Sequence, residues 1–246
     1  MRIPDEIEAL GRAFLDGLNH ALGQKLFGVY LYGALAFSDH GAITDVDFHV
    51  ILKDILDTNE KMKLRDLHKT LARDFPPLGA ELDGYYILLD DARRTSPPEH
   101  QFLDNVFDNS WALHRAHIRA GRCVVLQGPD PKRVYPESSW PELASALKGE
   151  LDYVKTHLDE YPAYCVLNLC RLMYSFKTRD VVISKRSSAD WAQELLQDWR
   201  PLICAALDSY TGQASQQDEK LLASEVRNFF GLASGYILEN QRGKTP

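Results

Sequence analysis

Hydrophobic and polar residues in the first third of the chain follow helical and extended patterns in turn. Two segments carry apolar side chains mostly three and four positions apart, which predicts amphipathic helices at residues 5–22 and 57–75. Three short runs rich in β-branched and aromatic residues predict strands at residues 27–33, 45–54 and 81–91. Asp57 or Thr58 is the expected cap of the second helix, and Pro76-Pro77 ends it. This region therefore predicts a small mixed sheet with flanking helices.

Beyond Arg93 the extended runs give way to long helical patterns. These patterns cover residues 99–120, 139–160, 162–178, 187–208 and 216–240, with a possible short strand at 122–126. The stretch Ser96-Pro97-Pro98 marks the expected boundary, because proline cannot donate a backbone hydrogen bond and disfavours helix in the residue before it. We therefore predict an α/β plus all-α protein, with one domain at residues 1–95 and a helical bundle at 96–246.

Composition and charge limit the class of partner. The chain has 246 residues and a formal net charge of -7, so it lacks the basic surface that binds nucleic acid, whereas a small cationic substrate is compatible. The four cysteines show neither CxxC spacing nor the density of a disulfide scaffold. The acidic start of the chain does not resemble a signal peptide, and no segment has the length of a membrane span. We expect a cytoplasmic protein.

The segment with the clearest chemistry is Leu31-Tyr32-Gly33-Ala34, followed by a ten-residue connection and then Asp45-Val46-Asp47. A glycine at the end of a strand lets backbone N–H groups approach a phosphate closely. Aspartates two positions apart on one strand point to the same face, where their carboxylates can hold Mg²⁺. Asp-x-Asp is also common in surface turns, and the glycine turn before it is what favours a catalytic role. We therefore expect Asp45 and Asp47 to hold metal and to be catalytic.

Transfer of a nucleotidyl group also needs a base close to the attacking hydroxyl, so a third carboxylate is expected. Glu81 and Asp83 share one face of the third predicted strand by the same alternation. An adjacent strand can bring either residue beside the aspartate pair. We favour Asp83.

These residues resemble the signature of the nucleotidyltransferase superfamily, in which a glycine-serine pair, a spacer and Asp-x-Asp follow one another. The chain is most similar to the aminoglycoside (3'')(9)-adenylyltransferases, in the spacing from Gly33 to Asp45 and in the strand ELDGYYILLDD. The resemblance implies an N-terminal nucleotidyltransferase fold, a helical domain for substrate and nucleotide, and Mg²⁺ with ATP as co-substrate. Lining up the acidic pair that ends the strand places Asp83 on the family's catalytic base, which also contacts substrate.

The resemblance continues in the helical half, through Arg171-Leu172-Met173-Tyr174-Ser175, Lys185 and Ala189-Asp190-Trp191-Ala192. It implies nucleotide contacts from Arg171 and Lys185 beside those of Gly33 and Ala34, and substrate contact from Trp111. Taken by themselves, the two cations also suit solvated or ion-paired helix positions, and a tryptophan is more often a core residue.

Two features depart from the family pattern. Ala34 stands where the family usually has a serine whose hydroxyl contacts phosphate, so backbone donors alone remain there. The acidic residues with which the family holds aminoglycoside amines have no clear counterpart in this chain, although Asp159 and Glu160 lie in the helical half.

His114 and His117 are three positions apart in a predicted helix. We expect them to be ordinary helix residues, because no other ligand cluster accompanies them. His49 shares the face of Asp45 and Asp47 and has no assigned role.

The expected function is Mg²⁺-dependent transfer of AMP from ATP to a hydroxyl of an aminoglycoside or aminocyclitol antibiotic, an activity associated with antibiotic resistance. One alternative is the same chemistry on a protein side chain or another small acceptor. A second alternative is a nucleotide-binding relative without catalysis. The three carboxylates favour an enzyme, since a binding module has no need of them.

Overall fold

The computed structural model describes residues 3–39, 41 and 43–242. Its contacts divide the chain into two compact units, each described here by itself. The first unit extends to Ser38 and resumes from Ile43 to Ser139, and the second contains Asp39, Gly41 and the chain from Trp140 onwards. The division at Ser139 lies well beyond residue 95, where the sequence pattern placed the domain boundary. The reason is that a strand and a helix after residue 95 pack on the N-terminal sheet.

The first unit is built on a four-stranded sheet with the strand order β3-β2-β1-β4. The strands are β1 (Leu26–Tyr32), β2 (Val46–Leu52), β3 (Leu82–Leu88) and β4 (Val124–Gln127). β1 pairs antiparallel with β2 and β4, whereas β2 and β3 run parallel. The predicted small mixed sheet is confirmed, including the short strand that the sequence allowed near residues 122–126.

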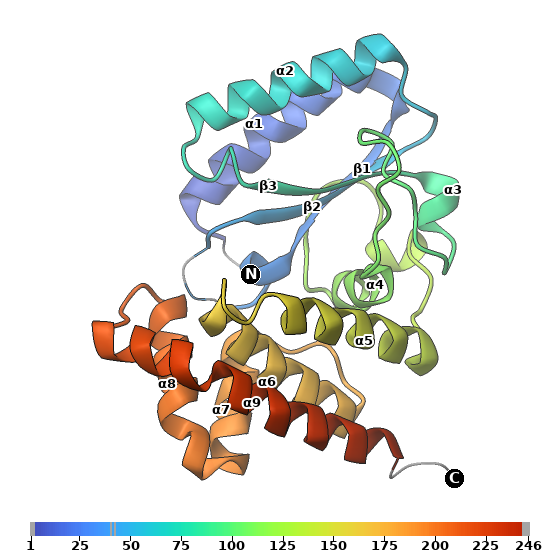
Figure 1. Ribbon diagram of the computed structural model, residues 1–246. Helices are drawn as coiled ribbons and strands as arrows, with labels where there is room; N and C mark the ends of the chain where they lie inside the picture. Colours follow the sequence, from blue (N-terminus) through green and yellow to red (C-terminus); the bar gives the residue numbers. More distant parts are fainter. Residues whose placement is uncertain (1–2, 40, 42, 243–246) are drawn as a thin grey trace. The chain divides into compact units, whose positions relative to one another are not determined.

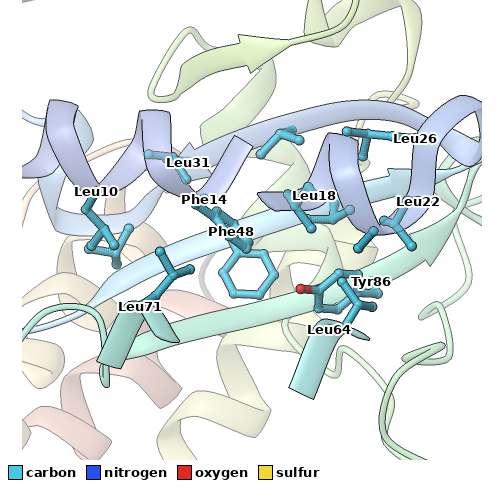
Figure 2. Packing of buried hydrophobic residues seen from close by; sticks show 14 of the residues in the cluster. Leu10, Phe14, Leu18, Leu22, Leu26, Leu31, Phe48, Leu64, Leu71 and Tyr86 are labelled. Atoms are coloured by element: carbon cyan, nitrogen blue, oxygen red, sulfur yellow. The ribbon is translucent and has the colours of Figure 1, made fainter. Parts of the chain in front are cut away.

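Two helices supply the core on one face of the sheet: α1 (Asp5–Leu22) and α2 (Thr58–Asp74) lie side by side along it (Figure 1). Leucines and Phe14 of α1 pack with Phe48 of β2 and with Leu64 and Leu71 of α2 (Figure 2). The alternation along β2 therefore sends its apolar side chains into this core.

Asp57 starts α2 as a capping box, since its carboxylate accepts from Glu60 N–H and the Glu60 carboxylate accepts from Asp57 N–H, each at 2.8 Å.

The opposite face of the sheet carries a more polar and aromatic layer. Tyr30 and Tyr32 of β1 are buried there with Trp111, Ile118 and Tyr135. Trp111 and Ile118 belong to α4 (Trp111–Arg119), which packs against β1. A short helix, α3 (Leu89–Ala92), follows β3 at once, so the strand is shorter than the predicted 81–91. The side chains of Asp47 and His49 point to this second face.

The predicted helix at 99–120 is present only from Trp111 onwards. Glu99 and Phe107 form an isolated antiparallel bridge, and the ring of His100 accepts backbone N–H bonds from Phe102 and Leu103. These local hydrogen bonds replace helical ones across residues 99–110. The stretch is therefore a loop whose last residues, including Asp108, approach the sheet.

The second unit is helical, which confirms the predicted bundle. Its helices are α5 (Trp140–Thr156), α6 (Pro162–Thr178), α7 (Lys185–Leu195), α8 (Arg200–Tyr210) and α9 (Gln216–Arg242). α6 is central, since it contacts each of the other four helices. The predicted helix at 187–208 is two helices, because Pro201, in the first turn of α8, lacks the N–H that a helix continuing from α7 would need. Among the described residues, no helix has the length and apolar character to cross a membrane.

Candidate active site

The register of β2 and β3 brings two of the predicted carboxylates together. The parallel strands pair Asp47 with Asp83 directly, so the two side chains leave the same face of the sheet from adjacent strands. Glu81 precedes β3, and its carbonyl oxygen accepts a hydrogen bond from Val46 N–H at 2.9 Å. Between the two candidates for a third carboxylate, Asp83 is therefore the one beside Asp47.

Gly33 lies against the Asp47 carboxylate. It follows β1 directly, in the turn Gly33–Ala36, and its φ of 76° lies in the left-handed region that favours glycine. A β-carbon on residue 33 would lie 1.7 Å from Asp47 Oδ2. Only glycine at this position leaves room for the carboxylate, so the turn and the aspartate form one structural unit.

Asp45 stands immediately before β2 and is exposed, as is Asp83, whereas Asp47 is half-buried. The donors are hard carboxylate oxygens at an accessible strand end, which is the ligand set that Mg²⁺ prefers. Ala34 is half-buried in the turn, and its carbonyl oxygen accepts from Phe37 N–H at 3.1 Å. The residues present therefore fit Mg²⁺ at Asp45 and Asp47.

Behind Asp47, the same face of the sheet carries a group that sequence reasoning missed. Asp108, from the loop before α4, is fully buried between two histidines. Its Oδ2 atom lies 2.8 Å from His114 Nδ1 and 3.6 Å from His49 Nε2. The sequence placed His114 as an ordinary helix residue, but the structure places it in this group. No local pattern marks Asp108, because it sits in a loop far along the chain from β2.

The pKa values of Asp108 and His49 depend both on burial and on the interactions between these residues and His114. Burial acts to raise the pKa of Asp108, but His114 and His49 outweigh it, so the net pKa lies below the usual value. Burial lowers the pKa of His49, partly opposed by Asp108. Neither ring nitrogen of His49 has a hydrogen-bond partner among the described residues, at a cost of about 1–3 kcal/mol for such a group. Asp108 is therefore held in its charged form, while the imidazole of His49 lacks a hydrogen bond to any described residue.

Two tyrosines, Tyr32 and Tyr85, lie on the same face of the sheet as Asp47 and His49. Tyr32 pairs with Asp47 across β1 and β2, and its hydroxyl lies 3.3 Å from His114 Nδ1. Burial, with the nearby charge of Asp47, raises the pKa of Tyr32 well above its usual value. Burial also raises the pKa of Tyr85 to about 12. Both phenols therefore stay protonated at neutral pH.

Trp111 lies in the core rather than at a surface. Its side chain is 1% exposed, and its indole N–H donates to the carbonyl oxygen of Arg94 at 3.0 Å. The guanidinium of the buried Arg115 lies 5.6 Å from the ring centre. This burial argues against the substrate contact expected of Trp111, because no face of the ring is open to a ligand.

The two predicted cations of the second unit lie on neighbouring helices. Arg171 belongs to α6, where its Nη1 donates to Asn168 Oδ1 at 3.3 Å. Lys185 is the first residue of α7, and its ammonium lies 4.9 Å from the ring centre of Tyr164 and 5.2 Å from that of Tyr210. Both side chains are half-buried. Aromatic faces therefore hold Lys185 at the positive end of a helix.

The start of α7 is held by a residue from the N-terminal part of the sequence. Ser184 caps the helix through Ser187 N–H at 2.9 Å. Asp39 Oδ2 accepts from the hydroxyls of both serines, at 2.5 Å from Ser184 and 2.6 Å from Ser187. Asp39 comes from the connection between Gly33 and Asp45, so this connection contributes a segment to the second unit.

Comparison with known protein families identifies the helical half. Residues 136–234 match the family described as "Aminoglycoside adenylyltransferase, C-terminal domain". This match spans Arg171 and Lys185. No curated protein sequence matches the chain.

Comparison with solved structures identifies the fold of the chain as a whole. A crystal structure of the spectinomycin adenyltransferase AAD(9) from Enterococcus faecialis, with ATP and spectinomycin, is similar with a TM-score of 0.74 and 15% sequence identity. The similarity covers 92% of this chain and 99% of the other. It confirms an N-terminal nucleotidyltransferase fold followed by a helical part. The chain thus resembles the aminoglycoside adenylyltransferases, and its match to their C-terminal domain, together with the shared fold, indicates a nucleotidyltransferase enzyme.

Proposed function

We propose that this protein transfers AMP from ATP to a hydroxyl group of an aminoglycoside or aminocyclitol, in a reaction that requires Mg²⁺. The observation that carries the proposal is the direct pairing of Asp47 with Asp83, beside a glycine whose missing side chain makes room for Asp47. Three carboxylates at the ends of two adjacent strands supply both a metal site and a base. A module that only binds nucleotide needs no such arrangement.

Each carboxylate has a distinct role in the proposed reaction. Asp45 and Asp47 would hold Mg²⁺, which neutralises phosphate charge when bound. Asp83 accepts the proton of the attacking hydroxyl. The substrate oxygen forms a bond with the α-phosphorus, the bond from that phosphorus to the bridging oxygen breaks, and pyrophosphate leaves. Asp83 is exposed at the strand end and therefore accessible to a substrate as large as an aminocyclitol.

The nucleotide contacts come from backbone and from cations. The N–H groups of the turn at Gly33 and Ala34 bind phosphate oxygens without the serine hydroxyl usual in the family. Arg171 and Lys185 supply positive charge for the triphosphate. Lys185 suits this role because Tyr164 and Tyr210 restrict its side chain before any ligand binds, which lowers the entropic cost of binding.

The acceptor class rests on three lines of support. The family description names aminoglycosides, the similar crystal structure contains spectinomycin, and a net charge of -7 favours cationic substrates. ATP as donor has the same structural support. Because the reaction consumes ATP, we expect the protein to act in the cytoplasm.

The test is release of pyrophosphate from Mg²⁺ and ATP with spectinomycin, streptomycin and a panel of other aminoglycosides. We expect release that depends on both drug and Mg²⁺ and that falls at least about 100-fold in Asp47→Asn. Asp66→Asn is a matched control, because Asp66 is an exposed aspartate of α2 whose ion pair with Lys69 is largely open to solvent. Its rate should equal that of the unaltered protein.

Two other results would each support a different function. Pyrophosphate release with a protein acceptor, and none with the panel, would move the proposal to another acceptor. Binding of ATP without turnover on any acceptor would indicate a nucleotide-binding relative, in line with the loss of serine at position 34. Equal release from Asp47→Asn and the unaltered protein would overturn the catalytic assignment.

A further inference from the structure

Three possible metal ligands meet on the inner face of the sheet, apart from the carboxylates of Asp45 and Asp83. They are His49 of β2, Asp108 of the preceding loop and His114 of α4, and one ligand atom from each lies within 4.8 Å of the other two. His49 and Asp108 are fully buried, and His114 is 26% exposed. The three residues come from separate parts of the sequence. Folding alone brings them together.

Asp108 is within ion-pair distance of both histidines, but a hydrogen bond of normal length joins it to only one of them. His114 Nδ1 lies 2.8 Å from Asp108 Oδ2, which is a normal charge-assisted hydrogen bond. His49 lies on the other side of the same carboxylate, with Nε2 at 3.6 Å from Oδ2, beyond hydrogen-bond distance. Within the described part of the chain, both of its ring nitrogens lack a hydrogen-bond partner although the side chain is fully buried. A buried imidazole aimed at a carboxylate without bonding it suits a third component between them.

The spacing suits a tetrahedral ion. Ligand atoms bound to Zn²⁺ at about 2.0–2.1 Å lie roughly 3.3 Å from one another in a tetrahedral site. The distances from Asp108 Oδ2 to the two histidine nitrogens, 2.8 and 3.6 Å, bracket that value. The hydroxyl of Tyr32 lies 3.3 Å from His114 Nδ1, at the edge of this group. A water molecule would supply the fourth ligand of such an ion.

We propose that His49, Asp108 and His114 bind a transition-metal ion of the Zn²⁺ class. Two imidazoles and one carboxylate are a ligand set for such ions, whereas Mg²⁺ prefers oxygen ligands. The site is separate from the proposed Mg²⁺ site. Asp47 and His49 lie two residues apart on β2, about 6.6 Å along the strand. The bound ion links β2, the loop at Asp108 and the first turn of α4. It would therefore hold these three segments in place next to Asp47.

Metal uptake by the full-length protein tests the proposal without any measurement of activity. The chain is dialysed against a chelator and titrated with Zn²⁺ in competition with a chromophoric chelator. We expect one ion per chain, with affinity at least about 100-fold weaker in His114→Gln, which removes a first ligand at a partly exposed position. His157→Gln is the matched control, since His157 lies in the second unit and stacks on Tyr153. Its Zn²⁺ affinity should equal that of the unaltered protein.

A third variant separates this site from the Mg²⁺ carboxylates. Asp47→Asn should keep its Zn²⁺ affinity, and Co²⁺ in place of Zn²⁺ should give the same visible absorption spectrum in Asp47→Asn as in the unaltered protein. Zn²⁺ should also raise the unfolding temperature of these two proteins but not of His114→Gln or Asp108→Asn, because an ion that binds the folded state stabilises it. Loss of binding in Asp47→Asn, undiminished binding in His114→Gln, or no uptake by the unaltered protein would each overturn the proposal.

Discussion

The Oδ2 atom of Asp47 lies 1.7 Å from the position that a β-carbon on residue 33 would take. The two residues are far apart in sequence but adjacent in the sheet, because Tyr32, which precedes Gly33, pairs with Asp47. Gly33 therefore has two functions at once. It turns the chain through a positive φ, and it leaves the space that lets a carboxylate approach the turn.

Gly33→Ala tests this relationship. The methyl group would force Asp47 away from the turn, and we expect the rate of AMP transfer to fall at least about 100-fold. Gly121→Ala is a matched control, since Gly121 has a similar φ of 80° but no heavy atom within 4 Å of the new β-carbon. Both variants should lose about 1 kcal/mol of folding free energy from the backbone conformation. Equal activity in the two variants would contradict the steric argument.

Asp83→Asn should lower kcat by about 100- to 10,000-fold while leaving the KM for ATP nearly unchanged, because the amide cannot accept the proton of the attacking hydroxyl. Glu81→Gln removes a carboxylate two residues earlier, outside the paired register, and should retain activity. Steady-state kinetics with spectinomycin would check both. A larger loss in Glu81→Gln than in Asp83→Asn would assign the base to Glu81.

Lys185→Met keeps an unbranched chain of similar length between Tyr164 and Tyr210 but removes the charge. If the ammonium binds phosphate, the KM for ATP should rise about tenfold, which is the effect of losing about 1.4 kcal/mol of binding energy. Lys177→Met, at the exposed end of α6, should leave that KM as it is. An unchanged KM in Lys185→Met would assign the lysine a packing role.

Asp39 gives a prediction for pH. Burial acts to raise the pKa of its carboxyl, but hydrogen bonds from the hydroxyls of Ser184 and Ser187 outweigh it and hold the pKa below its usual value. A carboxyl with a lowered pKa stabilises the folded state above its unfolded pKa, and this contribution is lost as the pH falls through the lower, folded value. Asp39→Asn should therefore lower the urea midpoint at pH 7, and this difference should shrink as the pH falls below about 4.

The control for this pH effect is Asp190→Asn, since Asp190 is an exposed aspartate further along α7. Its urea midpoint should follow that of the unaltered protein at both pH values. A constant difference between Asp39→Asn and the unaltered protein from pH 7 to pH 3 would show that the carboxylate charge of Asp39 does not contribute.

The elements that the sequence predicted best are those with local causes. The capping box at Asp57 and Glu60 and the alternation along β2 depend on residues within a few positions of each other. The pairing of Asp47 with Asp83 has no such local cause. Alternation placed both on one face of their own strands, but the parallel register that joins them arises only when the strands pair.

The residues that sequence reasoning could not place are those whose environment is set by distant chain segments. The family resemblance implied a substrate contact for Trp111, whereas in the structure its ring is buried beside Arg115 and its indole N–H donates to the Arg94 carbonyl. The sequence left His49 without a role and made His114 an ordinary helix residue, because their common partner, Asp108, stands in a stretch that carries a helical pattern but folds as a loop. Burial and long-range contact decide such positions, and neither can be read from spacing.

The hydrogen bonds that Asp39 accepts from the first turn of α7 belong to a second unit that is discontinuous in sequence. The helices from Trp140 onwards are synthesised last, but the acceptor for Ser184 and Ser187 is made before most of the sheet. A fragment that begins at Trp140 would lack that acceptor, and a fragment that ends at Ser139 would carry it without its partners. Separating this protein at its apparent boundary therefore leaves neither half complete.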